Sequence, residues 1–204
     1  MPKNLREVYN GFAATYEQNR GLFDMTGVLG HFYEALSIKK GKLLDLGCGA
    51  GEPFARFFAD NGWQVTGVDF SEKMLTMAAK YVPEMKTVCQ DMRDVDFAPR
   101  SFDAITAVYS LFHVPRADHQ ILFEKMHRWL NPKGCLLFTY ATKEYTGYDE
   151  FDGYKEFLGE KLYYSHKTPK DLYKDLINAG FKILSADYRA IGGETFLWVT
   201  AEND

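Results

Sequence analysis

One stretch constrains the fold of this 204-residue chain more than any other: residues 43–53, LLDLGCGAGEP. A short apolar run ends in an acid and three alternate glycines, and Pro53 then opens a segment with helical spacing. Glycines in such a turn permit positive φ and remove side chains that would keep a ligand away from the backbone. The stretch therefore predicts a strand, a tight turn and a helix start that together hold a nucleoside-type cofactor.

The glycine spacing separates two cofactor classes that use this geometry. Dinucleotide-binding loops follow G-x-G-x-x-G, and their helix N-terminus faces a pyrophosphate. Here the third glycine comes one residue early, at Gly51, and Glu52 occupies the position that this pattern gives to glycine. An acid at this place repels a pyrophosphate and suits a cationic ligand. A nicotinamide dehydrogenase is therefore the disfavoured alternative.

Two further acids stand at the ends of the next two expected strands. Residues 64–69 predict a strand that ends at Asp69. Residues 87–92 predict a third strand, with Asp91 near its end. A carboxylate at a second strand's end can accept hydrogen bonds from both hydroxyls of a ribose. Solvated loop acids are the alternative, but positions at successive strand ends favour contact with a ligand.

These segments, followed in order by residues 102–113 and 130–137, resemble the motifs of the class I (Rossmann-like, seven-strand) S-adenosylmethionine-dependent methyltransferases of small-molecule type. The resemblance implies S-adenosylmethionine as cofactor and S-adenosylhomocysteine as product. It also implies a small-molecule acceptor, methylated by in-line displacement at the sulfonium. A non-catalytic S-adenosylmethionine sensor, or a subunit that acts through a partner, stays open as the alternative.

The resemblance implies the cofactor contacts as well. Backbone groups near Gly47 and Tyr109 would hold the methionine ammonium, and Asp91 would bind the adenine together with Met92. Asp45 either contacts the cofactor or caps local backbone donors. The full expected set is Asp45, Gly47, Cys48, Gly49, Gly51, Asp69, Phe70, Met74, Asp91, Met92, Tyr109, Ser110, Tyr16 and Arg20.

Three of these expected contacts have a second interpretation. Met74 has helical spacing with core positions, so it either packs in the core or faces the adenine. By analogy with the family, Tyr16 would reach over the cofactor carboxylate and Arg20 would assist. Both can equally be ordinary surface residues at a helix end.

Acceptor recognition is expected outside the shared motifs. Residues 142–167 form a long connection rich in aromatic side chains, and connections of this length usually form a lid or a binding wall. His113 follows the fourth strand close to where the methyl group should project. It either contacts or deprotonates the acceptor, or it is a hydrogen-bonded structural histidine. His166 is a second candidate of the same kind.

The alternation of strand and helix patterns predicts an α/β fold in one methyltransferase domain. We expect N-terminal helices that act as a lid in residues 1–40, the cofactor-binding core in 41–141, the acceptor lid in 142–167, and a helix and hairpin in 168–204. The sheet is expected to be doubly wound, mostly parallel and seven-stranded, with an antiparallel strand from the C-terminal hairpin and helices on both faces.

Composition limits the partners. The chain has 24 basic and 28 acidic residues and a net charge of −4, without a basic stripe, so nucleic acid is disfavoured as substrate. We found no apolar signal region and no apolar run long enough to span a bilayer, so we expect a soluble cytoplasmic protein. The oligomeric state stays open.

The sequence offers little for a metal. Cys48, Cys89 and Cys135 are isolated and lack metal-ligand spacing, so they are predicted to be reduced core residues. Glu124 and His127 match a spacing that carboxylate-bridged metals use, but companion ligands on other helices are not evident. We therefore expect no metal site.

Overall fold

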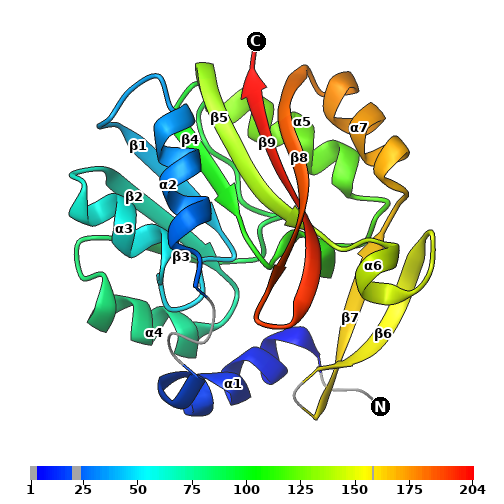
Figure 1. The fold of residues 1–204 in the computed structure, drawn as a ribbon. Coiled ribbons are helices and arrows are strands. Elements are labelled where there is room, and N and C mark those ends of the chain that lie inside the picture. The colour runs from blue at the N-terminus through cyan, green and yellow to red at the C-terminus, as the bar shows by residue number, and fades with distance from the viewer. Residues whose placement is uncertain (1–3, 20–23, 158) are drawn as a thin grey trace.

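The computed structural model describes residues 4–19, 24–157 and 159–204 (Figure 1). Strands and helices alternate along most of the chain, as the sequence predicts. The elements are α1 (Leu5–Asn19), α2 (Thr26–Ala35), β1 (Lys42–Leu46), α3 (Phe54–Asp60), β2 (Gln64–Asp69), α4 (Glu72–Tyr81), β3 (Lys86–Cys89), β4 (Phe102–Ala107), the 3-10 helix η1 (Leu111–His113), α5 (His119–Trp129), β5 (Leu130–Tyr140), α6 (Lys143–Thr146), β6 (Phe151–Phe157), β7 (Glu160–His166), α7 (Pro169–Asn178), β8 (Phe181–Ile191) and β9 (Glu194–Asn203).

The main sheet has seven strands in the order β3-β2-β1-β4-β5-β9-β8. The first five strands in this order, from β3 at the edge to β5, pair in parallel with one another. β9 is antiparallel to both of its neighbours, β5 and β8. This arrangement confirms the predicted sheet, including the antiparallel strand from the C-terminal hairpin.

Side-chain alternation along the strands gives each face of the sheet its own core. In β1, Leu43 packs in the cluster that contains α2, α3 and α4, and Leu44 packs in the cluster that contains α5 and α7. Successive strand residues point to opposite faces, so a buried parallel strand needs apolar residues at nearly every position. Helices therefore cover both faces, as Figure 1 shows.

The order of the strands fixes where a ligand can bind. The chain winds outward from β1 to β3 and then returns to the other side of β1 with β4. Ligands of open α/β sheets bind at such a switch point, beyond the carboxyl ends of the strands. In Figure 1 this edge faces α1 and the turn between β8 and β9.

Residues 142–167 fold into elements that the sequence analysis did not specify. The short helix α6 leads into β6 and β7, which form a separate antiparallel two-stranded sheet with Phe151 opposite His166. The hairpin shares a hydrophobic cluster with α1, in which Val8, Phe112 and Tyr164 are buried. The segment for which a lid role was predicted thus folds mainly into a β-hairpin that packs beside α1.

The prediction for the cysteines was wrong in one case. Cys48 and Cys135 are buried, but Cys89 is exposed. Cys89 ends β3, which lies at the edge of the sheet and whose residues are largely exposed. An edge strand has only one neighbour, so its side chains are covered less than those of a central strand.

Candidate active site

The three loop glycines have different reasons to lack a side chain. All three have positive φ: +74° at Gly47, +51° at Gly49 and +84° at Gly51. A Cβ at Gly47 would lie 2.3 Å from Ser110 Cβ, and one at Gly51 would lie 2.8 Å from a methyl of Val82. At Gly49 the nearest atom would be 3.8 Å away. Gly47 and Gly51 therefore allow close packing, whereas Gly49 leaves space beside a cavity.

Asp69 links the glycine loop to the start of α4. Its Oδ2 accepts a hydrogen bond from the Gly49 N–H at 2.9 Å, and its Oδ1 accepts one from the Ser71 N–H at 2.8 Å. Burial raises the pKa of Asp69, and these two hydrogen bonds partly oppose the shift. The side chain that the sequence predicts for the ribose is thus fixed next to the loop.

Asp45 is a second buried carboxyl group near the same loop. Only 5% of Asp45 is exposed, and Thr106 Oγ1 donates a hydrogen bond to its Oδ1 at 2.7 Å. Burial raises the pKa of Asp45 to about 7, the Thr106 hydrogen bond opposes this, and the charge of Asp69 adds to it. A cationic ligand near these acids would stabilise their ionised forms.

Asp91 is held by a cation that the sequence analysis missed. Arg93 Nε and Nη2 donate to the two oxygens of Asp91 at 3.1 and 2.8 Å, and the Arg93 N–H donates to Oδ1 at 2.9 Å. Although partial burial of Asp91 acts in the opposite direction, its contacts with Arg93 lower its pKa. An adenine amino group would therefore share this carboxylate with Arg93.

Two adjoining cavities open at the carboxyl edge of the sheet. The smaller has about 60 Å³ and the larger about 530 Å³, and both are bordered by Phe70, Met92, Ser110 and His113. Ligand pockets typically have roughly 300 to 1,000 Å³. The two cavities together are therefore large enough for a nucleoside-type cofactor and part of an acceptor.

Most of the expected contacts border these cavities. Asp45, Cys48, Gly51 and Met74 border neither, and Cys48 Sγ instead lies against Gly67. Arg20 lies outside the described residues, as does the side chain of Tyr16. The expected residues that border the smaller cavity are Gly47, Gly49, Asp69, Phe70, Met92, Tyr109 and Ser110, and Asp91 borders the larger one.

Helix α1 covers the smaller cavity through contacts that the sequence analysis did not find. Tyr9 borders this cavity, and its hydroxyl lies 2.9 Å from His113 Nε2. Ser71 Oγ donates a hydrogen bond to Asn10 Oδ1 at 2.7 Å. The residues of these two pairs are 104 and 61 positions apart in the sequence, so no local sequence pattern predicts the contacts.

His113 lies where the two cavities meet. Its Nδ1 is 2.6 Å from the Tyr163 carbonyl oxygen, which can only accept a hydrogen bond. Nδ1 therefore carries the proton, and Nε2 accepts from the Tyr9 hydroxyl. Burial lowers the pKa of His113 to about 4, against the Tyr163 hydrogen bond, so the imidazole is neutral at neutral pH.

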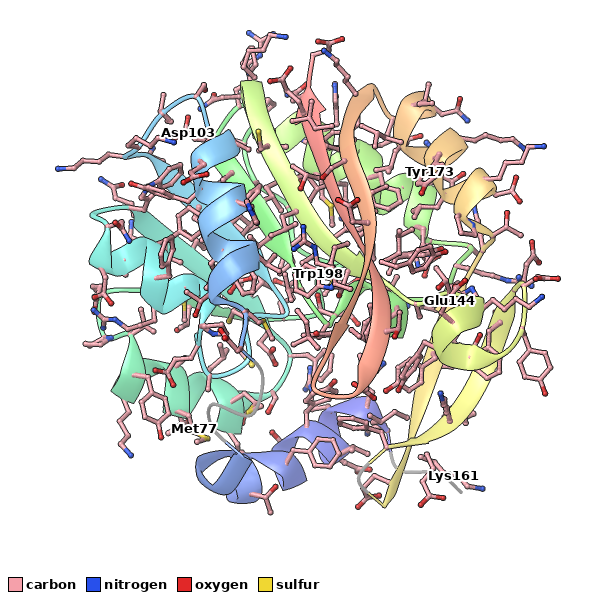
Figure 2. All side chains as sticks on the ribbon, viewed as in Figure 1. Met77, Asp103, Glu144, Lys161, Tyr173 and Trp198 are labelled. Atoms are coloured by element: carbon pink, nitrogen blue, oxygen red, sulfur yellow. The ribbon has the colours of Figure 1, made fainter. Side chains whose placement is uncertain are left out.

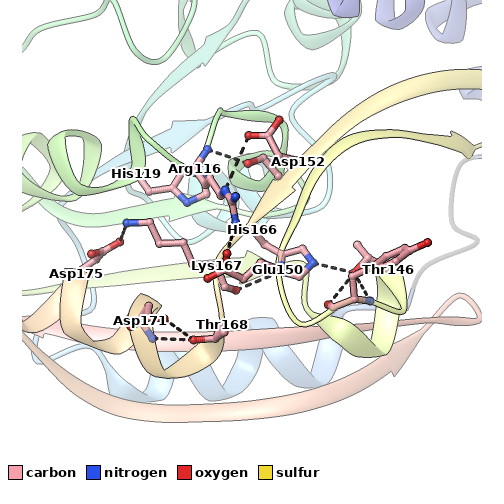
Figure 3. A network of polar contacts seen from close by, with 12 residues as sticks. Arg116, His119, Thr146, Glu150, Asp152, His166, Lys167, Thr168, Asp171 and Asp175 are labelled. Carbon is pink, nitrogen blue, oxygen red and sulfur yellow. Dashed lines mark hydrogen bonds and ion pairs between the residues drawn. The ribbon is translucent and has the colours of Figure 1, made fainter.

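His166 occupies a different environment from His113. Its Nε2 lies 2.8 Å from Thr146 Oγ1, and its Nδ1 lies 3.1 Å from the Lys167 carbonyl oxygen. Figure 3 shows it among the polar contacts at the root of the hairpin, near Glu150 and Arg116. His166 borders neither of the two cavities. A contact between His166 and the methyl acceptor therefore stays a prediction without support from this geometry.

A metal site or a membrane-spanning helix would indicate other functions. Within residues 4–19, 24–157 and 159–204, no group of three or more His, Cys, Asp or Glu side chains is arranged to hold a metal ion. Among the helices of these same residues, none combines the length and apolarity needed to cross a membrane.

Sequence comparison finds that part of the chain is similar to methyltransferases. The model of the methyltransferase domain matches residues 43–134. YqeM of Bacillus subtilis, which is provisionally named a methyltransferase, is 33% identical over 138 residues that cover 64% of this chain and 54% of that protein. The chain spans about half the length of the curated relatives it matches.

Structural comparison extends the similarity to nearly the whole chain. The 1,6-didemethyltoxoflavin-N1-methyltransferase of Burkholderia thailandensis, solved with 1,6-didemethyltoxoflavin and S-adenosylhomocysteine, has a TM-score of 0.70 and 18% identity, with 99% of this chain and 92% of that chain covered. The cyclase SpnF has a TM-score of 0.75 and 18% identity, with 98% and 96% covered. Residues 43–134 thus match a methyltransferase domain, and the fold of the chain is similar to that of S-adenosylmethionine-dependent methyltransferases of known structure.

Proposed function

We infer that the protein transfers the methyl group of S-adenosylmethionine to a small-molecule acceptor. One observation carries the inference: the open face of Gly49 and the carboxylate of Asp69 border one cavity, directly beside His113 and the covering helix α1. A cofactor held by Asp69 and the loop would thus lie next to the space that α1 and the hairpin enclose.

The charge of the site favours a cationic cofactor. Asp45 and Asp69 lie close enough that the charge of Asp69 raises the pKa of Asp45. A pyrophosphate would add negative charge to this pair, whereas an ammonium and a sulfonium would compensate it. Aromatic rings at the cavity, Tyr9 and Phe70 among them, can add on the order of 0.5 to 2 kcal/mol for each cation–π contact.

The reaction needs positioning more than side-chain chemistry. A sulfonium methyl group is already activated, so the acceptor atom must approach it in line with the departing sulfur, away from water. Such positioning can supply roughly 7 to 11 kcal/mol of the barrier. Helix α1 and the β6–β7 hairpin are the elements that can exclude water here, because both border the larger cavity.

Binding and turnover experiments test this function. We expect calorimetry to detect binding of S-adenosylmethionine and S-adenosylhomocysteine but not of NAD. In a screen of acceptor classes, we expect turnover of at least one acceptor to release S-adenosylhomocysteine. A protein that binds the cofactor yet consumes it with none of the acceptors would support the sensor alternative. Binding of NAD alone would overturn both.

We expect the affinity for S-adenosylmethionine to rise with pH between 5.5 and 7.5. Because burial raises the pKa of Asp45 to about 7, the free protein holds a proton there below this pH, and the positive charge of a ligand bound beside Asp69 favours the release of that proton. With one proton released, affinity at pH 5.5 should be at least tenfold lower than at pH 7.5. Calorimetry in buffers of different ionisation enthalpy measures the proton release. Asp45→Asn should abolish it, and a pH-independent affinity of the parent protein would contradict the argument.

A further inference from the structure

We propose that the acceptor is a planar phenol, that His113 Nε2 receives the proton of its hydroxyl, and that the Tyr9 hydroxyl occupies the acceptor's position when no acceptor is bound. This inference rests on the proposed methyl transfer and adds the nucleophilic atom, the base and the chemical class of the acceptor. It starts from the contact between Tyr9 and His113 across the cavity edge.

The hydrogen bonds of His113 define which nitrogen can act. The Tyr163 carbonyl oxygen fixes the proton on Nδ1, so Nε2 has the free electron pair and points to the Tyr9 hydroxyl. Tyr163 would continue to accept from Nδ1 after Nε2 gains a proton, which stabilises the imidazolium that forms. Burial keeps the imidazole unprotonated before the reaction, and the Tyr163 hydrogen bond opposes the cost that burial places on the imidazolium.

Other titratable groups surround this pair from several elements. Tyr164 on β7 lies against His113, with ring centroids 4.8 Å apart. The charges of Asp69 at the end of β2 and Glu194 on β9 act on Tyr9 and, with burial as the main cause, raise its pKa. Tyr9 is therefore a neutral hydroxyl that donates its hydrogen to His113.

The surroundings of the Tyr9 ring define the shape of the proposed acceptor. The ring meets Phe12, Phe70 and His113 edge to face, with centroid distances of 5.7, 5.8 and 5.7 Å. A ligand that replaces Tyr9 must present a flat ring to these three side chains and a hydrogen-bond donor to Nε2. A phenol has both features, whereas an aliphatic hydroxyl lacks the ring and an aryl ether lacks the donor.

The proposed step balances without a further reactant. The phenol O–H bond breaks and its proton moves to His113 Nε2, while an oxygen electron pair forms the bond to the methyl carbon. The carbon–sulfur bond breaks, and its electron pair stays on sulfur, which gives S-adenosylhomocysteine. The imidazolium then releases its proton to water. Tyr9 must first leave Nε2, so acceptor binding and the closed position of Tyr9 exclude each other.

Two variants separate the roles of the pair. His113→Asn keeps an amide donor for the Tyr163 carbonyl but has no basic nitrogen in place of Nε2. Loss of a general base typically costs 10²- to 10⁴-fold in rate, so kcat should fall by at least 100-fold while the Kd for S-adenosylmethionine changes less than threefold. Tyr9→Phe keeps the ring and removes the competing hydroxyl, so KM for phenols should fall severalfold.

A matched control exists for the second variant. Tyr33 donates its hydroxyl to the Lys39 carbonyl oxygen at 2.9 Å, the same length as the Tyr9 contact, and borders neither cavity. Tyr33→Phe should leave KM for phenols unchanged.

Nitrogen NMR of the S-adenosylhomocysteine complex tests the binding step with phenol itself as the probe and anisole as its control. In Tyr9→Phe, phenol should shift the His113 Nε2 signal and anisole should not. Absence of a shift with phenol would overturn the inference, as would an unchanged kcat in His113→Asn or equal losses of kcat and cofactor affinity in that variant. Turnover of amines or thiols but not phenols would overturn it and leave the methyl transfer intact. Failure to bind S-adenosylmethionine would instead reject the proposed function.

Discussion

Asp69→Asn is expected to weaken S-adenosylmethionine binding about 100-fold. An ionised carboxylate offers about four lone-pair positions, and the N–H groups of Gly49 and Ser71 take two of them. The other two are available to the ribose hydroxyls. Hydrogen bonds to a charged group each contribute about 1.5 to 3 kcal/mol. Asparagine removes the charge that would accept the two ribose hydrogen bonds, so the binding free energy should weaken by roughly 3 kcal/mol. Calorimetric titration at pH 8 measures the change.

Asp103 provides the matched control for this prediction. It also accepts two hydrogen bonds, from the Lys42 N–H at 2.8 Å and from Asn131 Nδ2 at 2.7 Å. Figure 2 places it at the opposite end of the sheet from α1 and from Lys161 of the hairpin. Asp103→Asn should therefore lower the melting temperature of the protein without changing cofactor affinity. If Asp69→Asn bound as tightly as the Asp103 variant, the ribose assignment would be wrong.

The sequence was sufficient for the sheet because its signals are local. β1 runs directly into the glycine loop and β2 ends at Asp69. Ser71 caps α4 by accepting from the Met74 N–H at 3.2 Å, as its position predicts. The hairpin of β6 and β7 was less evident. The aromatic residues of β6, Phe151, Tyr154 and Phe157, are spaced by three residues and not by two, so the pattern predicted a lid but did not define its strands.

The candidate site divides in the same way. Asp69 and Asp91 were predictable because a strand end locates each of them. The pairing of Tyr9 with His113 was not predictable, because it depends on how α1 lies across the finished sheet. The salt bridge of Arg93 with Asp91 had a local signal, a spacing of two residues directly after a strand, which an analysis that looks only for acids overlooks.

Gly47→Ala is expected to destabilise the protein by about 3 kcal/mol. A Cβ at residue 47 would lie 2.3 Å from Ser110 Cβ, and Ser110 cannot easily move because its Oγ donates to the Leu46 carbonyl oxygen at 2.7 Å. Overpacking of this kind costs roughly 1 to 3 kcal/mol, and the left-handed φ of +74° adds about 1 to 2 kcal/mol. For a chain of this size the melting temperature should fall by about 10 °C.

Gly49→Ala should affect cofactor binding more than protein stability, in contrast to Gly47→Ala. Its φ of +51° carries the same kind of backbone cost, but the nearest atom to a new Cβ would be 3.8 Å away. The methyl group would therefore project toward the cavity that Asp69 borders, and it should weaken S-adenosylmethionine binding at a small cost in melting temperature. Thermal unfolding and calorimetry of the two alanine variants compare the effects directly. If Gly49→Ala bound the cofactor like the parent, the ligand would not approach the loop backbone there, and alternate glycines would reflect packing alone.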